Sequence, residues 1–274
     1  MYSRVYVEIT NICNMNCSFC HGHHRAPRQM TEAEYARVLE QLQGKTQHLY
    51  HHLMGEPLVH PLLPRFIQMA RQAGFCPMLT TNGTLLATHG DAVLKMGLHK
   101  VNISLHSFEQ DQPEYHRQYL EQVAAFCEKA NAAGTIISLR LWNNGYDQGK
   151  NPTAVALLQQ LLPGQWTPNT RGYRIRDKLF LEWGDRFAWP DLNAPDYGSQ
   201  VSCYGMRDHF GILSDGTVVP CCLDSEGTIP LGNVFRQELS QILSSPRAEA
   251  IAQGFRCRKA TEELCRHCGY AQKL

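Results

Sequence analysis

The sequence contains no uninterrupted apolar stretch near the roughly 20 residues that a membrane-spanning helix needs. Neither sign of charge dominates, because 26 Lys and Arg stand against 25 Asp and Glu, a formal net charge of +1. Such a balance argues against a chain-wide electrostatic surface for nucleic acid. The N-terminus has no secretory pattern and runs directly into a strand-like segment. We therefore expect a cytoplasmic protein that binds neither membranes nor nucleic acid.

Cysteine, by contrast, is abundant, with 11 among 274 residues. An odd number cannot pair completely as disulfides, and clustered cysteines in a reducing compartment more often bind metal or act in catalysis. Three lie close together near the start, and six lie from Cys203 onward. Cys76 and Cys127 stand alone in apolar surroundings, which predicts that both belong to the core.

The first two-thirds of the chain alternates strand-like and helix-like runs. The expected strands are 6–9, 48–54, 75–80, 101–105 and 135–141, and the expected helices are 35–42, 62–73, 85–96, 115–133 and 153–162. Repeated β–α units of this length imply a parallel sheet with helical crossovers. Five or six units are too few for a closed eight-fold barrel. We predict an α/β fold based on an open, partial (β/α)6 TIM-like barrel.

A second, smaller domain is expected after the barrel. The pattern degrades from 163 to 197, with one strand-like stretch at 173–181, so we place the boundary near Pro195 and predict domains 1–195 and 196–274. Ser214-Asp215-Gly216 then separates two strand-like runs, which indicates a hairpin. Short helices are expected to follow. So little apolar sequence would form a marginal domain alone, and a bound metal would stabilise this Cys-rich α+β unit.

Cys13, Cys17 and Cys20 directly follow the first expected strand. This spacing also fits one face of a helix, where three cysteines would form a core stripe. The asparagine and serine residues between them favour a turn instead. An α/β barrel carries its chemistry at this edge of the strands. Three thiolates are too few for a closed zinc site but suit a cubane iron–sulfur cluster with one open iron.

The run Cys13-x3-Cys17-Ser18-Phe19-Cys20 resembles the CxxxCx(aromatic)C motif of the radical S-adenosylmethionine (SAM) superfamily. In that family three cysteines hold a [4Fe–4S] cluster whose fourth iron binds SAM, and reduction releases a 5′-deoxyadenosyl radical that removes a hydrogen atom from substrate. The resemblance covers approximately residues 5 to 160. It implies a radical SAM oxidoreductase that receives electrons from a donor such as flavodoxin or ferredoxin.

Further matches to the family concern the SAM site. Met54-Gly55-Glu56-Pro57 resembles the GGEP motif, whose backbone and glutamate receive the methionine ammonium, although the same sequence also suits an ordinary turn. By the resemblance, the Ser104 hydroxyl would contact the ribose or carboxylate of SAM, and Arg140 would bind the SAM carboxylate. Plain structural roles for both residues are the alternative. The cofactor-binding residues it implies are Phe19, Gly55, Glu56, Pro57, Ser104 and Arg140.

The C-terminal cysteines form a second group around the expected hairpin. A hairpin and a CxxC turn are usual devices for bringing four thiolates to one metal, and zinc is a fair candidate for such a closed site. The arrangement resembles the twitch form of the SPASM extension of radical SAM enzymes, which binds one auxiliary [4Fe–4S] cluster. The ligands it implies are Cys203, Cys221, Cys265 and Cys268, with Cys222 or Cys257 as possible replacements.

Three further residues are candidates for the substrate side. His52 and His106 lie near expected strand ends, where they would contact substrate or move protons, unless they are ordinary hydrogen-bonded imidazoles. Cys222 adjoins an expected ligand. In radical SAM peptide epimerases a free thiol returns a hydrogen atom to the substrate, and Cys222 could serve in that way. Packing, or exchange with a neighbouring ligand, is the alternative.

These features together predict an enzyme that abstracts hydrogen from a carbon of a peptide or small molecule, with the auxiliary cluster assisting oxidation. One alternative is a peptide epimerase or crosslinking maturase. Another is a non-enzymatic zinc-binding interaction module. Nothing in the sequence distinguishes dehydrogenation, crosslinking and epimerisation.

Overall fold

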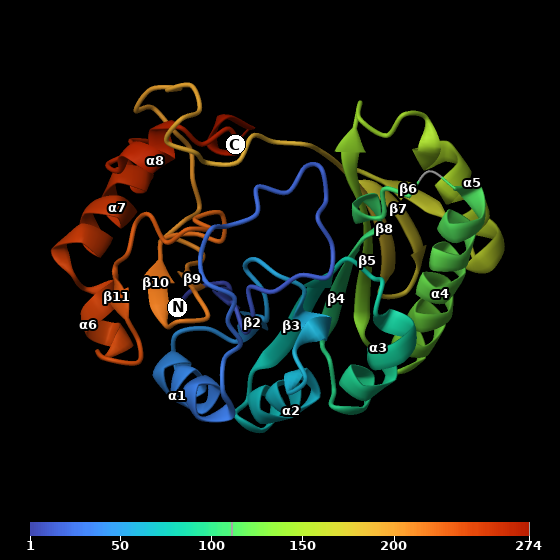
Figure 1. The fold of residues 1–274 in the computed structure, drawn as a ribbon, viewed down its shortest axis with the longest axis horizontal. Coiled ribbons are helices and arrows are strands. Elements are labelled where there is room, and N and C mark those ends of the chain that lie inside the picture. Colours follow the sequence, from blue (N-terminus) through green and yellow to red (C-terminus); the bar gives the residue numbers. More distant parts are fainter. Residues whose placement is uncertain (111, 274) are drawn as a thin grey trace.

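The computed structural model describes residues 1–110 and 112–273, in which the strands form one curved sheet (Figure 1). The sheet order is β11-β10-β9-β1-β2-β3-β4-β5-β8-β7-β6. Adjacent strands from β1 to β8 run parallel: β1 (Val5–Val7), β2 (His48–Tyr50), β3 (Cys76–Thr81), β4 (Lys100–Ser104), β5 (Ile136–Asn144) and β8 (Leu179–Asp185). The sheet stays open, as the number of β–α units predicts.

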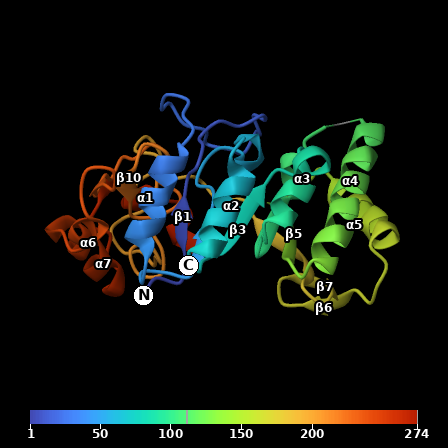
Figure 2. The ribbon, with the colours of Figure 1, turned by 90° about the horizontal axis from the view of Figure 1, so that it is seen from below.

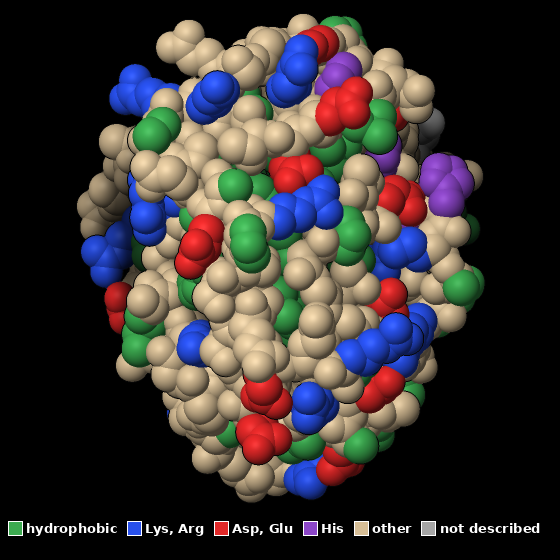
Figure 3. Space-filling view, turned by 90° about the vertical axis from the view of Figure 1, so that its left-hand side faces the viewer, with side chains coloured by type: hydrophobic (Ala, Val, Ile, Leu, Met, Phe, Trp, Pro, Cys, Tyr) green, Lys and Arg blue, Asp and Glu red, His purple; other side chains and the backbone are tan. Residues whose placement is uncertain are grey.

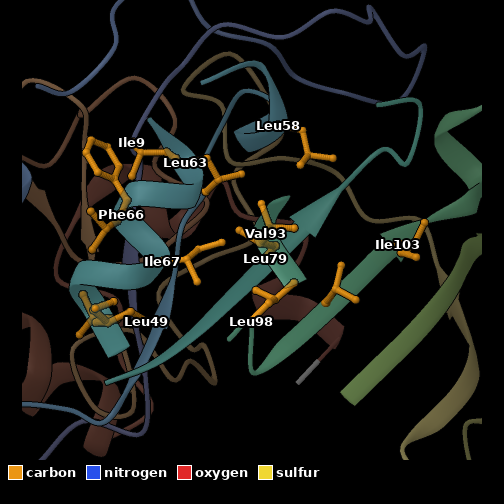
Figure 4. Close-up of a cluster of buried hydrophobic side chains, with 14 of the residues drawn as sticks. Ile9, Leu49, Leu58, Leu63, Phe66, Ile67, Leu79, Val93, Leu98 and Ile103 are labelled. Carbon is orange, nitrogen blue, oxygen red and sulfur yellow. The ribbon is translucent and has the colours of Figure 1, made fainter. Parts of the chain in front are cut away.

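Helices cover the convex face of this sheet in a row (Figures 1 and 2). They are α1 (Glu32–Leu42), α2 (Leu63–Gln72), α3 (Leu86–Lys95), α4 (Pro113–Ala132) and α5 (Lys150–Leu161). α1 begins at a capping box in which Thr31 accepts a hydrogen bond from the Glu34 amide at 3.2 Å. Buried side chains of α2, including Phe66 and Ile67, pack on strand residues such as Leu79 (Figure 4). No described helix is long and apolar enough to cross a membrane.

The C-terminal part extends the same sheet. The predicted hairpin is present, and its strands β9 and β10 pair antiparallel on either side of Ser214-Asp215-Gly216. β9 also pairs in parallel with β1, a long-range contact that local sequence patterns do not encode. The remaining elements are β9 (Gly211–Ile212), β10 (Thr217–Val219), β11 (Gly232–Asn233), α6 (Leu239–Leu243), α7 (Pro246–Arg256) and α8 (Glu263–Arg266). Cationic and anionic side chains are interspersed on the face shown in Figure 3.

Three details differ from the sequence-based expectations. The stretch 173–181 is a hairpin of β7 (Gly172–Arg176) and β8, next to β6 (Thr167–Asn169), and Lys178 takes the positive φ of 58° that its turn requires. The strand expected at 48–54 ends at Tyr50, and the Met54 amide instead donates to the Glu8 carboxylate at 3.2 Å. Cys127 is fully buried as predicted, whereas Cys76 is only half-buried.

Glu8, at the end of β1, joins three distant segments. Its completely buried carboxylate accepts two hydrogen bonds from Arg25, at 2.8 and 2.6 Å. It also accepts from the Ser214 amide and hydroxyl, at 3.1 and 2.9 Å, in addition to the Met54 amide. Glu8 therefore ties the cysteine-rich loop to the C-terminal hairpin.

Glu8→Gln should lower the free energy of unfolding by about 3 kcal/mol, because it leaves the Arg25 guanidinium buried without its counter-charge. The midpoint of urea unfolding measures this loss. Glu32→Gln is the matched control, since its ion pair with Arg65 is exposed and should contribute less than about 1 kcal/mol. Equal midpoints for the two variants would contradict a structural role for the Glu8 ion pair.

A second buried polar pair lies beneath α1. The Tyr35 hydroxyl donates to Nε2 of His51 at 2.6 Å, and Nδ1 of His51 donates to the Met78 carbonyl at 3.2 Å. Both side chains are completely buried. Burial lowers the pKa of His51 from 6.5 to about 4, so the ring is neutral in the folded protein at neutral pH.

Stability should therefore fall as the pH drops from 6.5 toward 4, because the unfolded chain takes up a proton on His51 that the folded chain resists. The loss attributable to His51 is about 3 kcal/mol across this window. The urea midpoint should differ less between pH 7 and pH 4.5 in His51→Gln than in the unmodified chain. His24→Gln, which changes an exposed imidazole, should leave the original pH dependence. An unchanged slope in His51→Gln would show that other groups cause the acid sensitivity.

Candidate active site

The loop between β1 and α1 carries Cys13, Cys17 and Cys20 across the open centre of the barrel (Figure 1). These residues form no helix, so they are not the core stripe that their spacing also allows. Asn11 shapes the loop by donating to the Ala26 carbonyl at 2.9 Å and accepting from the Arg28 amide at 2.7 Å. On this loop Cys13 and Cys20 are exposed and Cys17 is half-buried.

The three thiols lie on one loop, and two of them accept hydrogen bonds from backbone amides. Backbone amides donate to Sγ of Cys13 and of Cys20, each at 3.4 Å, and the Cys17 thiol donates to the Ser107 carbonyl at 3.6 Å. Burial raises the pKa of Cys13, and raises that of Cys17 to about 11, with repulsion from Cys20 adding to both. Three thiols on one loop, two of which accept from backbone amides, fit an iron–sulfur cluster, because bound iron would stabilise their deprotonated form.

Glu56 lies beside this loop with its carboxylate buried. It accepts hydrogen bonds from the Asn82 amide at 2.7 Å, the Thr81 hydroxyl at 2.8 Å and the Leu58 amide at 3.0 Å. Burial raises the pKa of Glu56 to about 7, although these hydrogen bonds favour the charged form. A carboxylate has about four acceptor positions, so one remains for a ligand such as an ammonium group.

Gly55 and Pro57 fix the turn that presents Glu56. Gly55 has a φ of 75°, and a Cβ there would lie 2.5 Å from the Thr10 carbonyl oxygen in the cysteine-rich loop. The Glu56 amide donates to the Ile12 carbonyl at 2.9 Å. Pro57 begins a short 3-10 helix. Only glycine therefore lets the turn pack this closely on the loop.

Glu56→Gln should weaken SAM binding roughly tenfold, because a neutral amide cannot make the charge-assisted bond to the methionine ammonium. The amide nitrogen would also face a donor that Glu56 now accepts from. Isothermal titration of the cluster-loaded protein measures the dissociation constant. Glu128→Gln, on the outer surface, serves as the control. An unchanged constant in Glu56→Gln would mean that Glu56 is only a turn residue.

Side chains on the concave face of the sheet are mainly polar. Ser104, Arg140 and Glu182 are register partners on neighbouring strands, which places them on one face. The Arg140 guanidinium lies over the Trp142 ring, 4.4 Å from its centroid, and 3.9 Å from the Glu182 carboxylate. Ser104 is half-buried at the end of β4. Both predicted residues thus lie where a ligand in the barrel could reach them.

Several buried polar atoms have no hydrogen-bond partner among the described residues. Five of them belong to side chains on or beside this concave face: His52 Nδ1, Asn102 Oδ1, Ser138 Oγ, Arg140 Nε and His209 Nδ1. Buried polar atoms are normally paired, so such a group points to a ligand or bound water. Sequence reasoning missed Asn102 and Ser138. Their alternation with the apolar residues of β4 and β5 was the available signal.

His52 and His106 both contact aromatic residues in the barrel. His52 meets the Tyr6 ring edge-on, at 5.7 Å between centroids, and His106 lies 4.9 Å from the Phe19 ring. Burial, followed by the nearby Arg140, lowers the pKa of His52 to about 3. Burial also lowers the pKa of His106 to about 4. Both rings are therefore neutral at neutral pH, and their role toward substrate stays a prediction.

The second group of cysteines lines a small cavity of about 30 Å³. Cys203, Cys221, Cys265 and Cys268 all line it, together with mainly apolar side chains. Burial raises the pKa of all four thiols, and neighbouring thiols raise it further for Cys203, Cys221 and Cys265. Four thiols around an apolar cavity fit a metal centre whose ligands are all supplied by the chain. Their role as ligands stays a prediction.

Cys222 and Cys257 do not line this cavity. Cys222 packs instead with Met54 and the apolar cluster around it, and its thiol lies near Tyr6. Burial raises the pKa of Cys222 to about 11. Cys257 is exposed, and Gln253 donates to its sulfur at 3.5 Å. The arrangement therefore favours the four-ligand set over either replacement.

Two family models match the chain, the Radical SAM superfamily over residues 7–142 and the SPASM iron–sulfur cluster-binding domain over 203–269. Among curated proteins, a GTP 3′,8-cyclase from Chlorobaculum tepidum is 28% identical over 165 residues, covering 57% of this chain and 50% of that protein. A probable GTP 3′,8-cyclase from Methanothermobacter marburgensis is 32% identical over 139 residues, covering 47% and 44%. The chain thus spans about half the length of these relatives.

Solved structures match nearly the whole chain. BtrN in complex with AdoMet and 2-DOIA gives a TM-score of 0.64 at 17% identity, covering 98% of this chain and 93% of that one. anSMEcpe with bound AdoMet gives 0.63 at 13% identity, covering 97% and 88%. SuiB from Streptococcus suis, bound to S-adenosylmethionine, gives 0.60 at 14% identity, covering 98% and 72%. These likenesses confirm the predicted fold class.

Proposed function

Since the chain belongs to the radical SAM superfamily and carries a SPASM domain, we propose that it oxidises a carbon centre of a peptide or small molecule by hydrogen abstraction. Membership confirms the predicted enzyme class and implies SAM, a [4Fe–4S] cluster and auxiliary iron–sulfur binding. The zinc-binding interaction module is therefore not retained. Reduction by flavodoxin or ferredoxin stays a prediction.

The observation that carries this proposal is the closed set of four thiols in the C-terminal cavity. With Cys203, Cys221, Cys265 and Cys268 all facing the cavity, a cluster there would have every iron bound by the chain. Such a cluster has no open position for substrate, unlike one held by Cys13, Cys17 and Cys20. Its simplest role is to accept an electron, which favours oxidation of the substrate radical over its quenching.

The residues of the barrel have definable parts in this reaction. When bound, the loop cluster and SAM supply a 5′-deoxyadenosyl radical that takes a hydrogen atom from the substrate. Glu56 would hold the methionine ammonium through its remaining acceptor position. The unpaired atoms of Asn102 and Ser138 would bind polar groups of the substrate. In net terms the substrate would lose one hydrogen atom, then one proton and one electron.

One contact favours a second candidate function, peptide epimerisation. The Cys222 thiol, near Tyr6 and packed beside Met54, lies outside the auxiliary cavity and next to the turn that presents Glu56. From there a thiol could return a hydrogen atom to a substrate radical. The thiol hydrogen would replace the one transferred to the 5′-deoxyadenosyl radical, with inverted configuration at the carbon. The Cys222 thiyl radical left behind would take one electron, from the auxiliary cluster or the external donor, and one proton to restore the thiol, so the substrate undergoes no net oxidation.

Reaction in D2O separates the two functions. Cluster-loaded enzyme is reduced with SAM and a panel of amino polyols and short peptides, and products are examined by mass spectrometry. Oxidation predicts a product two mass units lighter and a Cys222→Ala variant that still turns over. A product carrying one solvent deuterium, formed by the unmodified enzyme and lost in Cys222→Ala, would overturn the oxidation proposal in favour of epimerisation.

A further inference from the structure

A third group of metal-binding side chains lies at the opposite end of the strands from the cysteine-rich loop. His48 and Cys76 are the first residues of β2 and β3, and His99 directly precedes β4. One ligand atom from each lies within 4.8 Å of the other two. All three side chains are half-buried. This group belongs to neither of the cysteine sites described above.

The backbone brings these residues together. His48 and Cys76 are register partners in the parallel β2–β3 pair, so their side chains emerge side by side on one face. The His99 amide donates to the Pro77 carbonyl at 2.9 Å, which fixes His99 against the same end of β3. The imidazole centroids of His48 and His99 lie 6.0 Å apart. The sheet itself therefore sets the spacing of the three ligand atoms.

The hydrogen bonding of His48 suits a metal ligand. Its Nδ1 lies 3.2 Å from the Ser3 carbonyl oxygen, which can only accept, so the proton is on Nδ1 and the lone pair is on Nε2. Metal-binding histidines almost always donate their second ring nitrogen in this way.

We propose that His48, Cys76 and His99 bind a Zn²⁺ ion that cross-links the amino ends of β2, β3 and β4. Two imidazoles and a thiolate form a borderline-soft set that suits zinc, with water as the fourth ligand. Binding would release the Cys76 thiol proton. Arg71, Lys100 and Lys178 lie near His99, where their positive charges partly repel the ion. We therefore expect weaker binding than at a closed four-thiolate site.

The test uses cluster-loaded protein without a histidine tag, so that iron already fills the two cysteine sites. One equivalent of Zn²⁺ is added, excess is removed by desalting, and retained zinc is measured together with its K-edge X-ray absorption. The proposal expects about one zinc per chain, with two nitrogens, one oxygen and a single sulfur near 2.3 Å. A shell of four sulfurs would place the zinc in a cysteine site and overturn the proposal. Retention of less than a tenth of an equivalent would overturn it as well.

Two variants connect the zinc to these residues. Cys76→Ala should lose at least nine-tenths of the retained zinc while keeping its iron, whereas Cys127→Ala, at a buried cysteine outside the group, should keep both. His99→Gln tests the same site if Cys76→Ala folds poorly. This variant is also expected to lose the zinc. Zinc retained with the same sulfur shell in both Cys76→Ala and His99→Gln would contradict the assignment. Cleavage of SAM should be unaffected, so this outcome is independent of the proposed function.

Discussion

Replacing Cys13, Cys17 and Cys20 together by alanine should abolish 5′-deoxyadenosine formation and lower the iron content by about four atoms per chain. The three thiols lie on one loop, and bound iron would stabilise their deprotonated form, which burial disfavours for Cys13 and Cys17. No other group of thiols in the described chain leaves a cluster with an open position toward the barrel. The loss should therefore be complete rather than partial. Iron analysis and chromatography of the SAM products measure the two effects.

Cys257→Ala is the matched control for this loss. Cys257 is exposed and lies outside both cysteine groups, so the variant should keep all its iron and its SAM cleavage. Normal 5′-deoxyadenosine formation in the triple variant would contradict the assignment of the loop. Loss of cleavage with no loss of iron would also contradict it, because the loop would then act without holding a cluster.

Removing one thiol of the C-terminal cavity should have a different effect. Cys268→Ala should lower iron from about eight atoms per chain to about four while leaving SAM cleavage in the absence of substrate. Product formation should fall more than a hundredfold, because the electron acceptor, or the wall of the substrate site, is lost. The ratio of 5′-deoxyadenosine to product should rise accordingly.

Comparison of Cys221→Ala with Cys222→Ala tests the assignment on the hairpin. Cys221 lines the cavity, whereas Cys222 contacts Tyr6 and the apolar cluster around Met54. Cys221→Ala should lose iron as Cys268→Ala does, and Cys222→Ala should keep it. If Cys222→Ala loses half the iron while Cys221→Ala keeps it, the hairpin assignment is wrong by one residue. That result would also contradict the proposed role of Cys222 as a hydrogen-atom donor.

The elements that the sequence predicted are those encoded by local patterns. Apolar residues at helical spacing and glycine stops located the helices α1 to α5, and Ser214-Asp215-Gly216 located the hairpin. The turn between β7 and β8 escaped because it contains Asp177-Lys178 rather than glycine or asparagine, and lysine rarely adopts a positive φ. The β9–β1 pairing also escaped, since it joins residues about two hundred positions apart.

The site was predictable to a similar extent. Cysteine spacing identified the first group, whose three members lie within eight residues, and a hairpin and a CxxC turn identified the second, whose members are dispersed between Cys203 and Cys268. The role of Glu8 escaped, since its partners Arg25, Met54 and Ser214 come from three separate segments. Cys76 was expected in the core because its flanking residues are apolar, but its neighbours in space are His48 and His99. The surroundings of Glu8 and Cys76 are set by contacts between strands, which the order of residues along one strand does not reveal.

The central claim is that the chain holds two separate clusters, of which only one binds SAM. Electron paramagnetic resonance of the reduced, cluster-loaded protein tests this most directly, with spectra recorded before and after SAM is added. We predict two cluster signals, one of which shifts on addition of SAM, while the other stays unchanged and is missing in Cys268→Ala. A single signal, or two signals that both stay unchanged when SAM is added, would contradict the account.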